Sequence, residues 1–127
     1  MKISQSNIHA TKLSLHDNQL NVANYQIDPQ YYKKITPRDN NTYQLSLSAM
    51  ICNTEQKPFP LDLEVVFEVT FKLDDAKDQK EIDDFLNINA IQMVFPFMRA
   101  AINSLTSAAL MPPLVIPIID VRQFKEI

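Results

Sequence analysis

Glycine is absent from the 127 residues, and this absence excludes several classes of nucleotide-binding protein. Loops that cradle phosphate groups need glycine for close backbone approach and for positive φ angles. The sequence therefore holds no P-loop and no dinucleotide-binding fingerprint. Tight two-residue hairpins are disfavoured too, so we expect longer polar turns in which Asn and Asp adopt left-handed geometry.

Cysteine and positive charge are also scarce. Cys52 is the single cysteine, so the chain forms no internal disulfide and no multi-thiolate zinc cluster, which fits a reducing cytoplasm. The net charge of −3 provides no basic stripe for nucleic acid. The first residues show no basic start followed by an apolar block, and Arg99 or prolines interrupt the longest nonpolar stretches. We therefore expect a soluble cytoplasmic protein without membrane insertion.

Two segments in which apolar residues recur at every second position predict the centre of a sheet. Residues 61–73 place an apolar side chain at every odd position, and residues 43–52 repeat this pattern. The polar residues 53–60 join the two segments, so we expect antiparallel pairing with one packed face and one wetter face. Both segments exceed an ordinary strand, which favours a sheet that a second subunit extends or covers.

Two weaker segments predict the outer strands. Residues 8–15 have the pattern of a strand whose phase slips near Thr11 and Lys12, as a β-bulge would produce. Residues 25–35 carry aromatic and β-branched side chains but also Pro29, which suits an edge strand or a broken hairpin arm. The sequence therefore predicts four strands.

A long amphipathic helix is predicted after the sheet. Apolar side chains recur with three-and-four spacing over residues 88–110. The run of charges over residues 74–84 is typical of a solvated turn or of the exposed start of a helix. Pro96 lies on the polar stripe, where it removes a backbone hydrogen bond and should kink the helix or begin a new one.

The sequence holds more apolar surface than one sheet face needs. On the helix, Met93, Phe97 and Ala100 widen the apolar arc, which favours a contact between subunits. Residues 108–119 then contain no charged or hydrogen-bonding side chain, while prolines forbid a regular helix or a central strand. This extended segment either covers its own core or lines an apolar surface offered to another chain, and both interpretations remain open.

Residues with catalytic or metal-binding chemistry are few. No carboxylate or cysteine at a recognisable spacing completes a ligand set with His9 and His16, which favours surface or structural histidines. Cys52 ends a strand among outward polar residues, and nothing at a readable spacing activates it as a nucleophile. We therefore expect no enzyme, with no catalytic residue, no metal and no cofactor.

Three carboxylates share one face of the strand predicted over residues 61–73: Asp62, Glu64 and Glu68. Paired carboxylates serve acid–base chemistry, but a charged solvent face opposite a packed core is the ordinary reason for such a row. The functional alternative is an acidic docking face for a cationic partner.

The residues FEVTF at positions 67–71 and NINAIQMVFPFMRAAINSLTSAALMPPLVIPIID at positions 87–120 resemble the SecB family of export chaperones. In that family a strand leads through a polar connection into a long helix with an aromatic-proline-aromatic step and an arginine, which positions 95–99 match. A proline-rich apolar crossover, here residues 111–118, and a short second helix, here residues 119–127, complete the pattern.

The resemblance implies an α+β fold, in which a long, proline-kinked C-terminal helix and a short final helix pack a four-stranded antiparallel sheet. It places residues 1–127 in a single SecB-like domain, with subunits that form dimers and then a tetramer. It also implies an ATP-independent holdase for unfolded proteins or preproteins, which passes preproteins to the Sec motor ATPase.

This chain departs from the family pattern in three respects, because it has no glycine after the long helix, a shortened final helix and no acidic tail. The contact with the Sec motor therefore remains open. The alternatives are a divergent SecB-like chaperone dedicated to an antitoxin and a structural or adaptor oligomer.

In a holdase, grooves between the sheet edge, the crossover and the helices take up extended apolar segments, and weak contacts add over several subunits. The following residues are predicted to bind clients, although each also suits an ordinary core: Phe97, Met111, Leu114, Ile116, Ile118, Ile119 and Phe124.

Overall fold

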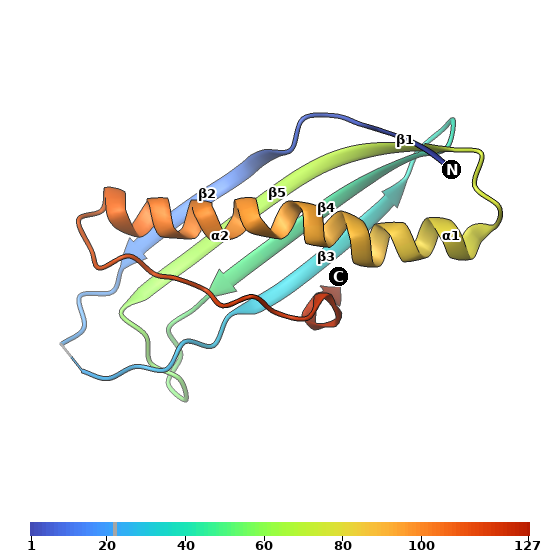
Figure 1. Ribbon diagram of the computed structural model, residues 1–127. Helices are drawn as coiled ribbons and strands as arrows, with labels where there is room; N and C mark the ends of the chain where they lie inside the picture. Colours follow the sequence, from blue (N-terminus) through green and yellow to red (C-terminus); the bar gives the residue numbers. More distant parts are fainter. Residues whose placement is uncertain (22) are drawn as a thin grey trace.

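The computed structural model describes residues 1–21 and 23–127 of the chain. A sheet of mainly antiparallel strands carries one long helix across one of its faces (Figure 1). The strand order is β1-β5-β4-β3-β6, and β2 also pairs with β5. The strands have the bounds β1 Lys2–Gln5, β2 His9–Asp17, β3 Gln30–Pro37, β4 Thr42–Ile51, β5 Leu61–Asp74 and β6 Lys125–Glu126.

The centre of the sheet follows the predicted alternation. Strand β4 pairs antiparallel with β5 over its full length, from Thr42 opposite Lys72 to Ile51 opposite Leu63. Every odd-numbered side chain of β5 from Leu61 onward is buried against the helix side, while the even-numbered side chains stay partly or fully exposed. This pattern confirms the prediction. Its physical cause is that each buried apolar side chain contributes about 1.5–3 kcal/mol to stability, which fixes which side chains of the strand face the core.

The sheet has six strands rather than the expected four. On one edge, β1 and β2 both pair with β5, and a break at Ser6 separates them. The Ser6 amide donates to the Thr70 carbonyl at 2.8 Å, and the Thr70 amide donates to the Ser6 hydroxyl at 2.9 Å, so the ladder continues across this break. The predicted bulge is confirmed by the register shift between Ala10 and Lys12.

Strand β3 begins at Gln30, immediately after Pro29, which is later than the predicted start. The edge of β3 that does not face β4 is also paired. There β6 pairs with it in parallel, with Tyr32 opposite Lys125 and Lys33 opposite Glu126. This two-residue strand replaces part of the expected final helix.

The long helix is continuous from Gln79 to Ala108 and starts earlier than predicted. Its first turns use the charged run, and the Asp78 carboxylate caps them by accepting a hydrogen bond from the Glu81 amide at 2.9 Å. No new helix begins at Pro96, which lies inside the last segment. The three consecutive segments are α1 Gln79–Asp84, the π-helical η1 Phe85–Asn89 and α2 Ala90–Ala108.

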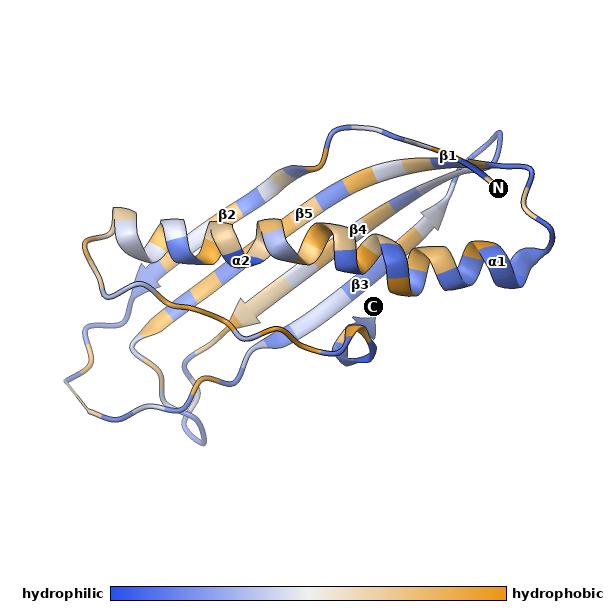
Figure 2. Ribbon diagram, viewed as in Figure 1, coloured by the Kyte–Doolittle hydropathy of each residue, from blue (hydrophilic) through white to orange (hydrophobic). Residues whose placement is uncertain are grey.

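The helix presents one apolar face to the sheet (Figure 2). Its length and composition alone would allow it to cross a membrane, but the core helix of a soluble protein meets the same criterion. On α2, the face that packs on the sheet comprises Ala90, Ile91, Val94, Phe95, Met98, Ile102 and Thr106.

Helix α2 ends without glycine. Leu110 adopts a left-handed conformation with φ 57°, its amide donates to Ser107 at 3.0 Å, and the Met111 amide donates to the Thr106 carbonyl at 3.0 Å. These two bonds form a Schellman motif, whose left-handed position is usually glycine. Left-handed turns at Asn40, Asn41 and Asp75 elsewhere confirm the expected use of Asn and Asp.

The predicted short final helix over residues 119–127 is wrong in extent. Only one turn forms, the 3₁₀ segment η2 Val121–Gln123, in which the Asp120 carboxylate accepts a hydrogen bond from the Arg122 amide. The next residues extend because Lys125 and Glu126 satisfy their backbone groups on the edge of β3.

Candidate functional site

The crossover, residues 111–118, lies beside α2 over the same face of the sheet and runs back towards β3 (Figure 1). Two side chains of α2 hold its backbone. The Thr106 hydroxyl accepts a hydrogen bond from the Leu114 amide at 3.0 Å, and the Arg99 Nε donates one to the Ile116 carbonyl at 2.7 Å. The guanidinium of Arg99 therefore holds the backbone of the crossover in place.

Three of the predicted client-binding residues attach the crossover to the core. Ile116 has only 1% of its surface exposed, and Met111 and Leu114 pack, partly buried, against the same core. Their side chains fix the path of the crossover in this structure, and a client-binding role for them stays a prediction.

Ile118 and Ile119 lie between two cavities. Ile118 is 80% exposed, and Ile119 is half-buried. Both line a cavity of about 280 Å³ against α2, together with Phe95, Arg99 and Phe124. They also line a second cavity of about 740 Å³ on the side of the segment that precedes β3. The structure thus brings Ile118, Ile119 and Phe124 together.

The wall of the second cavity was not predicted from the sequence. Tyr25, Ile27 and Tyr31 line it opposite Ile118 and Ile119. The available signal was the aromatic and β-branched content of this segment around Pro29, which pointed to an edge strand but not to its neighbours in space.

An aromatic cluster lies where the two cavities meet. The Tyr31 ring centroid lies 5.9 Å from that of Phe95 and 5.1 Å from that of Phe124, and the Phe95 and Phe124 centroids are 6.0 Å apart. These are the distances of favourable edge-to-face and tilted aromatic packing. The cluster fastens the chain end to the sheet and to α2, with Phe124 only 3% exposed.

The Tyr31 hydroxyl is the one buried side-chain polar atom among the described residues that lacks a hydrogen-bond partner. Burial raises the pKa of Tyr31 above its ordinary value, and the charge of Arg99 opposes this with a smaller effect. The hydroxyl therefore stays protonated at neutral pH and is available as a donor.

Phe97 lies apart from the other predicted client-binding residues. It is 53% exposed, next to Met93 at 39%, and both lie outside the buried face of α2. It lines neither cavity beside the crossover. Its position matches the outward apolar row that the sequence predicted for a subunit contact.

The three predicted acidic residues lie on the sheet face opposite the helix. Each carboxylate has a partner within the chain, so the row is a paired polar face, and its role as a docking face stays a prediction. The pairs are the Asn53 amide with Asp62 at 2.7 Å, Lys12 with Glu64, and the Gln44 side-chain amide with Glu68 at 3.1 Å.

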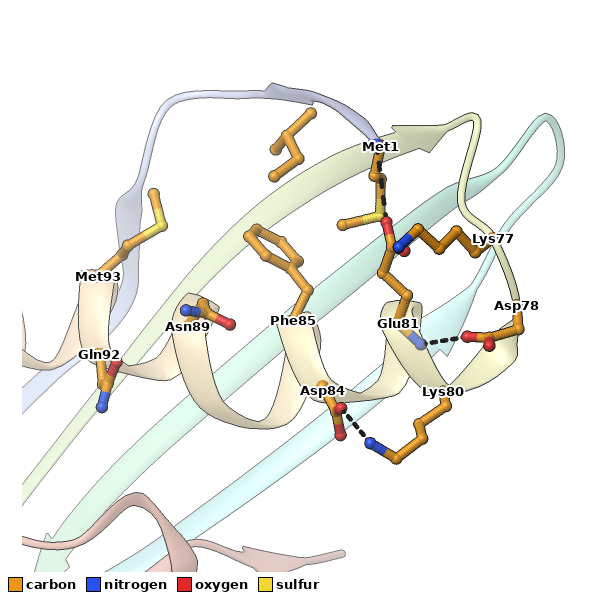
Figure 3. Close-up of a pocket in the computed structure, with 11 residues that line it drawn as sticks. Met1, Lys77, Asp78, Lys80, Glu81, Asp84, Phe85, Asn89, Gln92 and Met93 are labelled. Carbon is orange, nitrogen blue, oxygen red and sulfur yellow. Dashed lines mark hydrogen bonds and ion pairs between the residues drawn. The ribbon is translucent and has the colours of Figure 1, made fainter.

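A further open cavity of about 800 Å³ lies between β1 and the first half of the long helix (Figure 3). The amino group of Met1 pairs there with Glu81 at 3.7 Å, and Lys80 pairs with Asp84 at 3.0 Å. Figure 3 shows charged and apolar side chains of α1, η1 and α2, together with Met1, around this space. None of the predicted client-binding residues lines it.

The residues with potential chemistry remain separate. His9 and His16 lie opposite Glu68 and Asp62 at the two ends of β2, and Cys52 is exposed at the end of β4. Among residues 1–21 and 23–127, no three His, Cys, Asp or Glu side chains form a group that could hold a metal ion.

A sheet covered on one face by a long helix, with an apolar crossover returning beside it between two cavities, defines an α+β protein whose accessible feature is an apolar groove. The chain belongs to the SecB family. The family described as preprotein translocase subunit SecB matches residues 3–126, which confirms the resemblance found in the sequence.

Known proteins that are similar to this chain include a curated relative and a solved structure. Protein-export protein SecB of Anaplasma phagocytophilum (strain HZ) is 31% identical over 86 residues, which are 66% of this chain and 54% of the relative. This chain thus spans about half the length of that curated relative. A SecB-like chaperone of Mycobacterium tuberculosis, in complex with a ChAD peptide from the HigA1 antitoxin, shares the fold with a TM-score of 0.76 at 13% identity, over 93% of this chain and 91% of that chain.

Proposed function

We propose that this protein is an ATP-independent holdase that binds extended segments of unfolded polypeptides in the apolar groove beside the crossover. Family membership supports this proposal. The proposed client contacts are the predicted residues, with Ile118, Ile119 and Phe124 at the centre and the walls of both cavities around them.

The observation that carries the proposal is the uncovered apolar surface of the chain after α2. Ile118 is 80% exposed, Val115 is 62% exposed and Leu110 is 95% exposed, with prolines between them. Large exposed apolar surface marks interaction sites in soluble proteins. Side chains without charge or hydrogen-bonding groups recognise apolar segments in general rather than one sequence, which suits an unfolded client.

No chemical step belongs to this function, so the proposal includes neither catalysis nor a cofactor. Binding only the unfolded form of a client shifts the client's folding equilibrium by mass action. We propose a single domain over residues 1–127 that acts in the cytoplasm and assembles into dimers or tetramers. Linked grooves then raise avidity by roughly 10² to 10⁴ without a tight individual site.

Light scattering tests the holdase function directly. The purified protein, at micromolar concentration and without nucleotide, is mixed with a chemically denatured client that aggregates on dilution. We expect suppression of scattering at about one tetramer per client, while bovine serum albumin at equal mass serves as a control. Unchanged aggregation at this ratio would reject the holdase.

Oligomerisation is tested through the outward row of α2. Because Phe97 is 53% exposed and Met93 is 39% exposed, we propose that these residues meet a second copy. Phe97→Ser should shift the native mass spectrum towards smaller species while the thermal stability of the protomer is retained. A protein that is monomeric throughout the micromolar range would remove the multivalent mechanism.

Dedication to one antitoxin is the second candidate. The observation that favours it is the fold shared with the mycobacterial chaperone solved with an antitoxin peptide. A dedicated chaperone or an adaptor should leave a panel of unrelated unfolded proteins unprotected, whereas a general holdase protects most of them.

Transfer to the Sec motor is tested separately. If the motor binds the row Asp62, Glu64 and Glu68, its binding should weaken when all three carboxylates are replaced by the amides Asn or Gln.

A further inference from the structure

The segment of residues 117–123, called the strap below, crosses the aromatic cluster with little attachment of its own. Ile116 before it is 1% exposed and Phe124 after it is 3% exposed, so both ends are fixed in the core. Between them the residues are exposed or half-buried. Such a segment moves readily when another apolar chain competes for the same surface.

Within the described residues, most hydrogen bonds of the strap lie inside its own turn, and one further bond joins that turn to its anchor, from the Phe124 amide to the Val121 carbonyl at 3.1 Å. The Gln123 amide donates to the Asp120 carbonyl at 3.0 Å, and the Arg122 amide donates to the Asp120 carboxylate at 2.8 Å. The Arg122 guanidinium bonds the same carboxylate at 2.7 Å. None of these bonds joins the strap to α2 or to a strand of the sheet, so lifting the middle of the strap breaks mainly apolar contacts.

The strap also divides one space into two. Ile118 and Ile119 line both the cavity of about 280 Å³ and the cavity of about 740 Å³. If the strap moves outward, the two cavities become one groove from Arg99 on α2 to Tyr25 before β3, with the aromatic cluster as its floor.

The floor of this groove carries an unpaired donor. Tyr31 is 5% exposed, lines the larger cavity, and its hydroxyl has no partner among the described residues. A buried hydroxyl without a partner destabilises a fold, and in a native protein it calls for an explanation. A phenylalanine at this position would pack equally well without that destabilisation, so the hydroxyl points to a partner outside the chain.

We propose that an extended client segment displaces the strap, occupies the joined groove over Tyr31, Phe95 and Phe124, and accepts a hydrogen bond from the Tyr31 hydroxyl at one of its main-chain carbonyls. This inference rests on the proposed holdase function. A main-chain carbonyl is the acceptor that every polypeptide offers whatever its sequence. Tyr31 therefore binds the client backbone, while the apolar walls bind its side chains.

Removing only the hydroxyl tests the polar contact. Tyr31→Phe is compared with the unmodified protein for binding of fluorescein-labelled, reduced and carboxymethylated α-lactalbumin, measured by fluorescence anisotropy. We expect the Kd to rise about five-fold (about 1 kcal/mol). Stability towards urea should stay equal or rise, because the variant loses an unpaired buried hydroxyl.

The matched control is Tyr32→Phe. Tyr32 is the next residue of β3, pairs with Ser48, and lies on the opposite face of the sheet. It should leave the Kd unchanged. An unchanged Kd in Tyr31→Phe with unchanged or raised stability, or an equal loss in both variants, would assign Tyr31 to packing alone and overturn the proposal.

A reversible tether tests the strap. In a Cys52→Ser background, Gln92→Cys and Ile118→Cys place two thiols on the walls of the smaller cavity. Joining them with a disulfide-containing bismaleimide should raise the Kd for the same client at least ten-fold, and reduction of the tether should restore it. Equal affinity in the tethered and the reduced protein would overturn displacement of the strap.

Different outcomes would reject the holdase function and the displacement of the strap. If the unmodified protein does not bind this client, the holdase function fails and the inference fails with it. If the unmodified protein binds, but neither Tyr31→Phe nor the tether changes the Kd, the holdase function stands and only the inference is overturned.

Discussion

The Nε of Arg99 donates a hydrogen bond to the carbonyl of Ile116 at 2.7 Å, and this bond fixes the crossover against α2. A bond from a charged donor in a half-buried setting contributes more than a neutral surface bond. Arg99→Ala should lower the free energy of unfolding by about 1.5 kcal/mol, measured by urea titration. In Arg122→Ala, which removes a guanidinium bonded to Asp120 on an exposed turn, the loss should be smaller.

Thr106 holds the crossover from a fully buried position. Its hydroxyl accepts a hydrogen bond from the Leu114 amide at 3.0 Å and donates within α2 to Asn103 at 2.9 Å. Thr106→Val keeps the shape but leaves the Leu114 amide without its partner, so the free energy of unfolding should fall by about 1–3 kcal/mol. Thr106→Ser keeps the hydroxyl and should retain slow hydrogen exchange at Leu114. Equally fast exchange in both variants would contradict this role.

Leu110 occupies the left-handed position of the motif that ends α2, with φ 57°. A residue with a Cβ is strained there, while glycine is not. Leu110→Gly should therefore raise the free energy of unfolding by about 0.5–1 kcal/mol, after allowance for the larger entropy of glycine in the unfolded chain. Leu110→Ala keeps the Cβ and should give no gain, and a gain equal to that of glycine would show that loss of the exposed leucyl side chain is the cause.

The central strands could be predicted because their burial alternates with a period of two. Every second side chain from Leu61 to Leu73 is buried, and this burial is written directly in the residue types. The bulge at Thr11 was predictable for the same reason, since an inserted residue shifts the phase of the pattern. The start of the long helix was not, because Ile82 and Phe85 lie among charges that are also typical of a turn.

The edges of the sheet carry no such signal. All four side chains of β1 and both of β6 are exposed, so pairing with β5 and β3 leaves no pattern in the sequence. Only part of the candidate site could be predicted from the sequence, because local patterns do not show contacts between distant residues. The apolar residues after α2 indicated a groove, but the contact between Phe124 and Tyr31 joins positions far apart in the chain, which local periodicity does not reveal.

The turn of the strap has a measurable acid response. The side-chain hydrogen bond from Arg122 is the main cause that lowers the pKa of Asp120 from 3.8 to about 2. A lowered pKa in the folded state stabilises the fold above the unfolded value and loses this contribution as the pH falls through the folded pKa. We therefore expect stabilisation by Asp120 above pH 3.8 that disappears as the pH falls towards about 2.

This pKa is measured by NMR titration of the Asp120 carboxyl carbon. In Arg122→Gln the pKa should return towards its ordinary value, while Lys125→Gln should leave it low. A pKa that stays low in Arg122→Gln would contradict the assigned cause.

The two sides of the groove should respond to truncation in opposite ways. Phe124 is 3% exposed within the aromatic cluster, so Phe124→Ala should lower the free energy of unfolding by about 3 kcal/mol. Ile118 is 80% exposed, so Ile118→Ser should leave stability unchanged but raise the Kd for the unfolded client about ten-fold, because it removes apolar surface that the client buries. Urea titration and fluorescence anisotropy measure the two effects.

The matched control for this prediction is Ile127→Ser. Ile127 is 82% exposed, as Ile118 is, but it lines neither of the cavities beside the strap. If client binding depends on general surface hydrophobicity, both serine variants lose affinity equally. If it depends on the groove, only Ile118→Ser does, and we expect this second result because a client segment must lie across both cavities to bury the aromatic floor.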